Sequence, residues 1–388
     1  MEFVELSSEE FSKVCNNFDG SSFYQSLEWA KIKEFTGWIH YYVGIKKNNK
    51  IVACSLILGK KIYLNKFMYY APRGMLLDYN NFELLTFFVK EVKKYLISKN
   101  GIIFKIDPLI IYKNHDKNGN LLDDNFSNQL IVDNLVNLGF HHRGFTIGYS
   151  DEVQFRWSYC LDINRSQEEI YKEMDQRCRR CIKKYEKYPL ELVDVNDDNI
   201  KDFKDIMEHT ANRQNHFDRT LDYYKKLDQE LGKKSKLSII YLDKKKFVQD
   251  FKDDKLFDIV SRDNREKIPV SAGVFIFDKH RGNYVYGGTY RDYMPLMAQY
   301  KMQMEMIKLS QKLKLPLYDF GGISGNFEVG SENYGVYEFK RGFGGYVVEY
   351  IGEFDLILDK FGYNIYAKSY ELYRNSKHLV AKVIRKGN

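Results

Sequence analysis

The order of predicted secondary structure elements occurs twice along the chain, and this repeat limits the folds that the chain can adopt. The first copy consists of the strands Ile51–Leu58 and Lys66–Gly74, the helix Asn81–Asn100 and the strand Gly101–Asp107. The later copy consists of the strands Pro269–Phe277 and Asn283–Thr289, the helix Tyr300–Leu313 and the strand Leu315–Asp319. Two β-β-α-β units in one order predict an α/β (α+β) fold built by duplication, with one site shared between the halves.

The length and composition fit two domains. At about 150 residues per domain, a chain of 388 residues suggests two domains, with three as the alternative, each large enough for its own apolar core. Hydrophobic residues make up 44% of the chain and aromatic residues 16%, which is typical of a folded protein. The first residues lack the apolar segment of a secretory signal, and no apolar run approaches the roughly 20 residues of a membrane helix. We therefore expect a cytoplasmic protein.

The distribution of charge says more than its balance of 60 basic and 53 acidic residues, a net +7. Basic residues cluster in one predicted helix, at Arg177, Arg179, Arg180, Lys183 and Lys184. A second cluster closes the chain, at Arg374, Lys377, Lys382, Arg385 and Lys386. Either cluster suits RNA phosphates or an anionic membrane surface, and the alternative is an ordinary solvated helix face.

Asp107 is a candidate acid–base residue. It ends a predicted buried strand and precedes Pro108. Side chains at strand ends in α/β folds point into clefts, where a carboxylate can accept a proton from an attacking ammonium group. The alternative is a turn residue, because Asp-Pro sequences favour turns.

Two cations lie among aromatic residues and glycines near the end of the second copy. Lys340 and Arg341 stand between Phe339 and Phe343. A cation fixed in such surroundings can bind phosphate or a developing oxyanion. Either Lys340 or Arg341 can play this role, and the alternative is an exposed basic pair at a strand end.

A candidate anion-binding pair is formed by Arg219 and Tyr223, which are four residues apart and share a face if they begin a helix. A guanidinium fork and a phenol on one face can hold a pyrophosphate, and the alternative is an ordinary surface pair. Lys33 lies on an earlier predicted helix, and Tyr284 and Tyr286 alternate along a strand. The alternation predicts that these two tyrosines point to the same face.

Two short motifs carry no chemistry in this interpretation. Cys178 and Cys181 have the spacing of a metal-binding or redox pair, but no second pair and no nearby histidine completes a four-ligand site. We therefore predict no metal. Asp319-Phe-Gly matches a kinase tripeptide, but no other kinase motif accompanies it, so we interpret the match as chance.

Six motifs in one order resemble the FemABX family of peptidoglycan interpeptide-bridge aminoacyltransferases, and the resemblance covers nearly the whole chain. The motifs are Phe23-Tyr-Gln-Ser-Leu-Glu-Trp-Ala-Lys-Ile-Lys, Tyr70-Ala-Pro-Arg-Gly, Lys105-Ile-Asp-Pro, Arg219-Thr-Leu-Asp-Tyr-Tyr, Tyr286-Gly-Gly-Thr and Glu338-Phe-Lys-Arg-Gly-Phe. The family fold implies two tandem acetyltransferase-like (GNAT) domains, residues 1–150 completed by 347–388, and residues 151–346. Residues 243–266 are too few for the long helical arm of some members, which implies the FemX-like form.

The resemblance implies an aminoacyltransferase that passes an amino acid from aminoacyl-tRNA to the stem-peptide amine of UDP-MurNAc-pentapeptide or lipid II. It implies no cofactor, because the tRNA ester is already activated. It also implies no DNA partner. The implied site residues are Lys340 and Asp107 for catalysis, and Lys33, Arg219, Tyr223, Tyr284, Tyr286 and Arg341 for the precursor. The basic helix then meets tRNA, and peripheral contact with the inner face of the membrane remains an alternative for the basic clusters.

Two other functions stay open. An acetyl-CoA-type N-acyltransferase would share the fold, but the glycine-rich motif that holds the coenzyme A pyrophosphate at a helix start is missing here. A non-catalytic protein that binds tRNA or cell-wall precursors would keep the basic helix without needing the set of candidate site residues.

Overall fold

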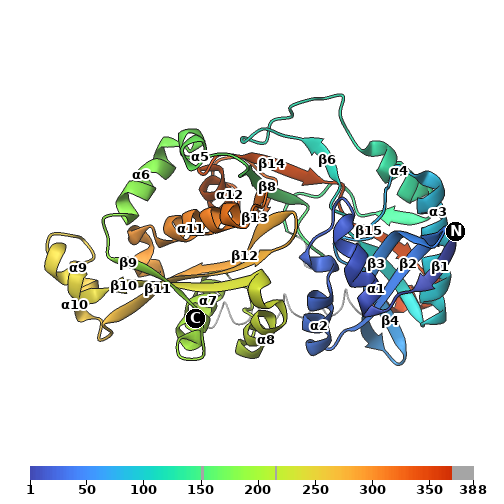
Figure 1. Cartoon of the computed structure of the whole chain (residues 1–388), viewed down its shortest axis with the longest axis horizontal. Helices are drawn as coiled ribbons and strands as arrows, with labels where there is room; N and C mark the ends of the chain where they lie inside the picture. Colours follow the sequence, from blue (N-terminus) through green and yellow to red (C-terminus); the bar gives the residue numbers. More distant parts are fainter. Residues whose placement is uncertain (150–152, 215, 369–388) are drawn as a thin grey trace. The chain divides into compact units, whose positions relative to one another are not determined.

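The chain forms two units, each built on one β-sheet (Figure 1). The structure, a computed structural model, describes residues 1–149, 153–214 and 216–368. Of these described residues, unit 1 contains Met1–Ile110, Asn128–Thr146 and those from Ile351 onward, and unit 2 contains Ile111–Ser127 and those between Ile147 and Tyr350. Residues 111–127, which the sequence analysis assigns to the first domain, therefore belong to unit 2.

Unit 1 has a seven-stranded sheet with the order β1-β2-β3-β4-β5-β15-β7. Its strands are β1 (Glu2–Glu5), β2 (Ile39–Lys47), β3 (Lys50–Tyr63), β4 (Lys66–Ala71), β5 (Gly101–Ile106), β7 (Phe140–His142) and β15 (Phe354–Ile357). Its helices are α1 (Ser8–Val14), α2 (Leu27–Phe35), α3 (Phe82–Ser98) and α4 (Gln129–Asn137). β4 and β5 pair in parallel, and α3 links them with a buried stripe that includes Leu85, Phe88 and Val92.

Unit 2 has an eight-stranded sheet with the order β6-β14-β8-β13-β12-β11-β10-β9. Its strands are β6 (Ile111–Asn114), β8 (Trp157–Asp162), β9 (Leu190–Asp194), β10 (Ser235–Asp243), β11 (Lys267–Phe277), β12 (Arg281–Thr289), β13 (Leu317–Ile323) and β14 (Tyr346–Tyr350). Its helices are α5 (Gln167–Glu173), α6 (Gln176–Tyr185), α7 (Ile200–Arg213), α8 (Leu221–Leu231), α9 (Lys244–Asp250), α10 (Phe257–Arg262), α11 (Ala298–Lys312) and α12 (Tyr334–Arg341).

Helices cover both faces of the unit 2 sheet (Figure 1). A side chain at Gly288 would meet Ile206 of α7, whereas one at the neighbouring strand position Gly273 would meet Met302 of α11. Gly288 pairs with Ala272, so these two contacts lie on opposite faces. α7 and α8 therefore cover one face, and α11 covers the other together with α5, α6 and α12.

The predicted repeat is confirmed by the order and direction of the strands. In both β1–β5 and β9–β13, consecutive strands pair antiparallel until the last pair, which is parallel. Two helices follow the first strand of each set, and one long helix, α3 or α11, links the parallel strands. The two units therefore share one topology.

The predictions for individual segments have different outcomes in the structure. The boundary predicted at residue 347 falls inside β14 of unit 2, and unit 1 resumes only at Ile351, shortly before β15. Residues 243–266 hold only the short helices α9 and α10, in agreement with the expected absence of a long arm. The C-terminal basic cluster lies outside the described residues. In the part of the chain that the structure describes, no helix is both long and apolar enough to cross a membrane.

A buried ion pair fixes the C-terminal strand β15 in the sheet of unit 1. The Lys105 ammonium donates to both oxygens of Asp355, at 3.0 and 3.2 Å, and both side chains are buried. Lys105 lies on β5, the strand beside β15. A segment from the end of the chain is thereby tied to the core of the first unit.

We expect Asp355→Ala to lower the free energy of unfolding of unit 1 by about 3–5 kcal/mol, because it removes the paired carboxylate of a buried ammonium. Urea titration followed by circular dichroism measures the effect. The control is Asp359→Ala, which breaks the more exposed pair with Lys66 at 2.8 Å and should cost about 1 kcal/mol or less. Equal losses in both variants would contradict this account of β15.

Candidate active site

The parallel pairing of β12 with β13 ends after only three residue pairs, and the candidate site lies at this point. The pairs are Arg281 with Leu317, Gly282 with Tyr318 and Asn283 with Asp319. Beyond them, β12 shifts register against β11, and β13 shifts register against β8 between Asp319 and Gly322. The backbone of Gly321 has φ +77°, a left-handed conformation that favours glycine. Both strands are thus irregular at the same level of the sheet.

Lys340 is buried at this irregularity. It lies in the last turn of α12 rather than at a strand end, and only 6% of its surface is exposed. Its ammonium donates to the Gly322 carbonyl at 2.6 Å, and the Tyr149 hydroxyl donates to the same oxygen at 3.2 Å. Burial lowers the pKa of Lys340 to about 7, although the nearby Asp319 carboxylate opposes the shift. This lysine therefore changes charge near neutral pH.

Asp319 holds the turn beside Lys340, although the sequence analysis assigns no function to it. One carboxylate oxygen accepts from the Ser158 hydroxyl at 2.5 Å and from the Gly321 N–H at 2.8 Å. The Arg281 guanidinium lies 3.6 Å from the other oxygen. Its position in the repeat, equivalent to that of Asp107, is the signal that could have identified it, had Asp319-Phe-Gly not been interpreted as a chance match.

Arg341, the alternative to Lys340, has different surroundings. Its guanidinium lies 3.6 Å from Asp175 and 5.7 Å from the ring centre of Tyr337, and its side chain is partly exposed. Neighbouring cations at the end of α12 thus face opposite environments, one buried beside a carbonyl and one paired near the surface. This difference favours Lys340 for chemistry that needs a desolvated charge.

A second group of predicted residues assembles at the start of α8. Arg219 precedes the helix, because Thr220 is its N-cap, yet its guanidinium still lies 5.3 Å from the ring centre of Tyr223. The nearby Tyr286 phenol raises the pKa of Arg219. Within the described residues Arg219 forms no ion pair. The adjacent Asp218 instead binds the Tyr224 hydroxyl at 2.6 Å and Lys204 at 2.9 Å. An exposed cation beside two phenols is suited to an anionic group.

The prediction that Tyr284 and Tyr286 point to the same face is wrong. Phe275 pairs with Tyr284, but Val274 pairs with Tyr286, so Val285 is the extra residue of a β-bulge. Tyr284 stacks on Phe275 at 5.3 Å in the core cluster on the α11 face. Tyr286 lies 6.3 Å from Tyr224 of α8, on the opposite face. Only Tyr286 therefore joins Arg219.

The two predicted residues of unit 1 lie in different surroundings. The Lys33 ammonium lies 4.9 Å from the ring centre of Trp29, one turn earlier on α2. Asp107 follows β5 and is buried. Its oxygens accept from the Tyr70 hydroxyl at 3.0 Å and from the Arg73 N–H at 2.8 Å. Asp107 thus fixes the turn after β4.

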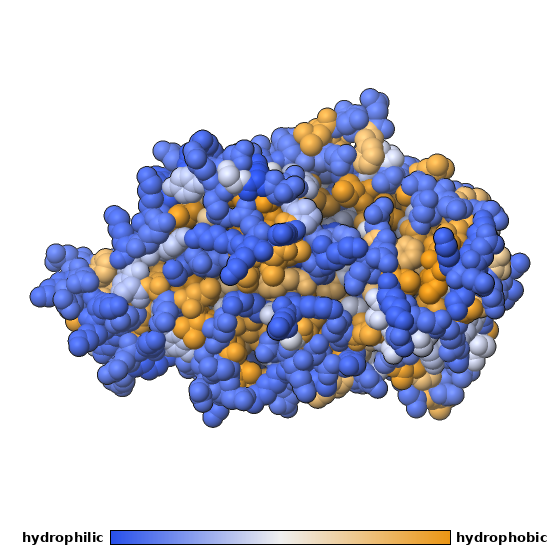
Figure 2. Space-filling view, in the orientation of Figure 1, coloured by the Kyte–Doolittle hydropathy of each residue, from blue (hydrophilic) through white to orange (hydrophobic). Residues whose placement is uncertain are grey.

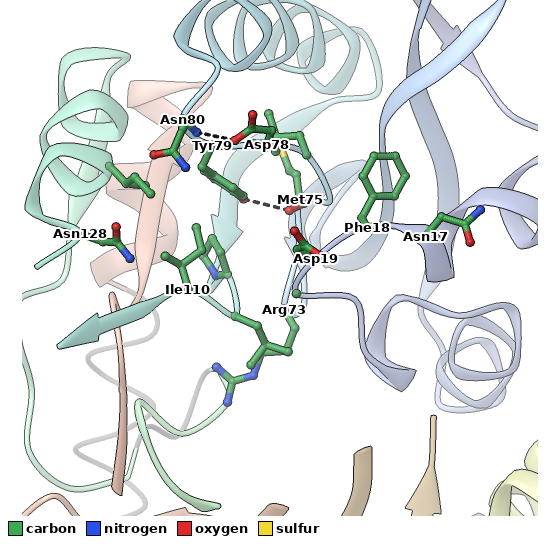
Figure 3. A pocket seen from close by; sticks show the side chains of 15 residues that line it. Asn17, Phe18, Asp19, Arg73, Met75, Asp78, Tyr79, Asn80, Ile110 and Asn128 are labelled. Carbon is green, nitrogen blue, oxygen red and sulfur yellow. Dashed lines mark hydrogen bonds between the residues drawn. The ribbon is translucent and has the colours of Figure 1, made fainter. Parts of the chain in front are cut away.

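A cavity of about 390 Å³ opens in unit 1 beside this turn (Figure 3). The residues that line the cavity come from four segments: 17–20, the loop that links β4 to α3, 108–110 and the start of α4. The Tyr79 hydroxyl donates to the Met75 carbonyl at 3.0 Å, and the Asn80 N–H donates to Asp78 at 2.9 Å (Figure 3). These bonds hold the loop in shape around the opening.

The predicted basic residues of α6 divide into engaged and open side chains. Arg177 pairs with Glu338 at 2.6 Å, and Arg179 donates to the Lys172 carbonyl at 3.1 Å. Arg180 and Lys183 are exposed, and no ion pair in the described part of the chain holds either of them. Figure 2 shows a mainly hydrophilic surface over α5 and α6. The open cations are therefore the ones suited to a polyanion.

The cysteine pair belongs to the packing of α6. Cys178 is buried in the core cluster of unit 2, and Cys181 is half-buried one turn later. Among the residues that the structure describes, no three His, Cys, Asp or Glu side chains gather as a metal site would require.

Comparisons with known proteins identify the relatives of this chain. Residues 6–257 and 254–371 match the sequence model of the FemAB family. The aminoacyltransferase FemA of Staphylococcus epidermidis is 27% identical over 94% of this chain and 98% of its own length, and FemB of the same species is 28% identical over 94% and 96%. The crystal structure of FemX has a TM-score of 0.79 at 22% identity, covering 94% of this chain and 99% of its own. A tandem GNAT protein from clavulanic acid biosynthesis has a TM-score of 0.50 at 7% identity, covering 92% and 98%.

Burial lowers the pKa of Lys340 to about 7 in the folded chain, whereas an unperturbed lysine has a pKa of about 10.4. Between these pH values the unfolded state therefore binds one more proton than the folded state. The contribution of Lys340 to the free energy of unfolding should therefore rise as the pH increases from about 7 to about 10. Urea titrations at pH 7 and pH 9 measure this. Lys340→Met should lose the rise, whereas Arg341→Met should keep it. An unchanged pH dependence in Lys340→Met would contradict a buried, nearly neutral lysine.

Proposed function

The chain belongs to the FemAB family, and we propose that it is an aminoacyl-tRNA-dependent transferase that extends the stem peptide of a peptidoglycan precursor. The observation that carries the proposal is the buried Lys340 ammonium beside an irregular strand, in a chain that matches this family from residue 6 to residue 371. The donor is an aminoacyl-tRNA, and the acceptor is UDP-MurNAc-pentapeptide or lipid II. Relatives that bear the name aminoacyltransferase align over nearly their whole length, which supports the assignment of one complete activity.

The reaction is the attack of an amine on an activated ester. The acceptor nitrogen forms a bond to the ester carbonyl carbon, the carbonyl oxygen becomes an oxyanion, and the bond to the ribose oxygen then breaks. The ammonium must lose a proton for the attack, and the ribose oxygen gains one as it leaves. Asp107, or a phosphate or carboxylate of the substrate itself, takes the first proton in this proposal.

Lys340 stabilises the oxyanion. A desolvated ammonium interacts with a developing charge more strongly than one in water, because the surroundings screen it less. Its hydrogen bond to the Gly322 carbonyl holds the ammonium in one place before the substrate arrives. Arg341 then has a supporting role, since its contact with Asp175 ties the end of α12 to the start of α6.

The group at the start of α8 holds the precursor pyrophosphate. Arg219 supplies the guanidinium, and the phenols of Tyr223 and Tyr286 lie beside it. Lys33 of unit 1 is a further cation for the precursor. Tyr284 has no part in this role, because the bulge at Val285 directs it into the core.

The open cations of α6 contact the tRNA, which is made and charged inside the cell. We therefore place the enzyme in the cytoplasm, where a lipid-linked acceptor would bring it to the inner face of the membrane.

We expect Lys340→Ala to lower kcat by about a hundredfold or more with little change in KM, because it removes a contact made as charge develops. Arg219→Ala should raise KM for the precursor and leave kcat mostly intact, because a phosphate contact exists before and during reaction. Mass spectrometry of products from mixed aminoacyl-tRNA and each precursor measures turnover. Arg341→Ala is the control for Lys340, and Tyr284→Phe is the control for Tyr286→Phe, which should behave like Arg219→Ala. Wild-type turnover by Lys340→Ala at saturation would refute its catalytic role.

Arg180→Glu combined with Lys183→Glu should weaken tRNA binding and flatten its salt dependence, since each lost phosphate contact reduces the logarithmic slope by about 0.7–0.9. Filter binding at several salt concentrations measures the slope. The control, Lys245→Glu with Lys252→Glu, makes the same charge change at exposed lysines in and just after α9. Equal weakening by both pairs would point to net charge rather than to a tRNA surface on α6.

A further inference from the structure

We propose that Asp319 is a positioning residue for Lys340: through the Gly321–Gly322 turn it fixes where the Lys340 amine lies, and its negative charge favours the protonated form of that amine. The effect on catalysis rests on the proposed function, but the effect on Lys340 itself does not. Asp319 acts in two steps, one of geometry and one of charge, and each has its own measurement.

The first step is the way Asp319 shapes the turn. Its buried carboxylate accepts from the Gly321 N–H at 2.8 Å, two residues along its own strand, and from the Ser158 hydroxyl of β8 at 2.5 Å. These bonds fix the direction of the peptide at Gly321 relative to two strands. Arg281 of β12 lies 3.6 Å from the same carboxylate, so a third strand also holds it.

This Gly321–Gly322 turn also holds Lys340. A Cβ at Gly321 would lie 2.8 Å from the Tyr284 carbonyl oxygen and 3.9 Å from the Lys340 nitrogen, so this backbone passes close to both. The left-handed φ of Gly321 directs the chain into Gly322, whose carbonyl accepts from the ammonium at 2.6 Å. A change in the Gly321 peptide would therefore move the acceptor of the Lys340 hydrogen bond.

The second step is charge. The titratable groups around Lys340 are Asp319 on β13, Cys160 on β8, Tyr284 and Arg281 on β12, and Tyr149 at the Gly322 carbonyl. Burial raises the pKa values of the Cys160 thiol and of the two tyrosines, so these groups are neutral at physiological pH. Arg281 is a cation that lies beside the Asp319 carboxylate. Asp319 is thus the one anion among these groups that favours the protonated amine.

The test is Asp319→Asn, which keeps the shape and the hydrogen-bonding oxygen but removes the charge. In the full chain labelled with 13C at the lysine ε-carbons, and with Lys340→Met to assign the signal, NMR titration gives the midpoint of Lys340 directly. We expect Asp319→Asn to lower that midpoint by about one pH unit, the lower end of the effect of a neighbouring opposite charge. The alkaline limb of the kcat profile should move by the same amount, which is about a tenfold loss of kcat above both midpoints. KM for the precursor should stay unchanged.

The outcomes separate the two proposals. If the Lys340 midpoint of folded Asp319→Asn equals that of wild type, the positioning role is overturned, even if the melting temperature falls as a purely structural role would predict. If the midpoint moves while kcat keeps its wild-type pH profile, Asp319 does act on Lys340, and the catalytic role of Lys340 in the proposed function fails instead. Asp243→Asn, which removes a carboxylate that accepts from the Lys246 N–H at 3.0 Å on α9, should change neither quantity.

If Asp319→Asn does not fold, Ser158→Ala takes its place. It removes one of the two donors to the same Asp319 oxygen and should shift the Lys340 midpoint in the same titration, with a several-fold loss of kcat at unchanged KM. An unaltered midpoint in this variant would also overturn the positioning role.

Discussion

The early end of the β12–β13 ladder is the constraint on which the candidate site depends. Backbone N–H and carbonyl groups that leave a ladder inside a protein must find other partners, because an unpaired buried group is costly. Here side chains supply them: Asp319 accepts from the Gly321 N–H, and Lys340 donates to the Gly322 carbonyl. The lysine is therefore buried for a structural reason, and its unusual proton affinity follows from that burial.

The duplicated unit shows what happens when the ladder continues. In unit 1, β4 and β5 stay paired up to Ala71 and Ile106, the last residues of both strands. Asp107 comes after this pairing, and its carboxylate reaches across to the Arg73 N–H of the neighbouring strand's turn. Both units thus use a carboxylate to hold a turn at the end of a parallel pair, but in unit 2 the shorter pairing also leaves a carbonyl that a lysine can hold.

The sequence predicts the elements and their repeat well, because strand and helix periods are local properties. It also predicts that Arg219 and Tyr223 meet. Their side chains still lie together, although Arg219 precedes the helix and does not belong to it. The prediction fails where one extra residue in a strand moves a side chain to the other face of the sheet. Nothing in Tyr284-Val-Tyr reveals the bulge that separates the two phenols, because the pairing with Phe275 and Val274 determines it. The difference between Lys340 and Arg341 likewise depends on neighbours far along the chain.

A lysine whose pKa lies near 7 is better suited to oxyanion stabilisation than a permanently charged one. A fixed cation would attract the phosphates and carboxylates of a precursor in the ground state, and such binding lowers KM without raising kcat. Because burial lowers the pKa of Lys340 to about 7, its free site carries only part of a charge at neutral pH. A developing oxyanion raises the proton affinity of the amine, so the interaction strengthens as the reaction proceeds. In the proposed mechanism, the energy that burial costs the charged lysine is recovered mainly in the transition state, and the Asp319 carboxylate is the proposed control on how much of that charge is present beforehand.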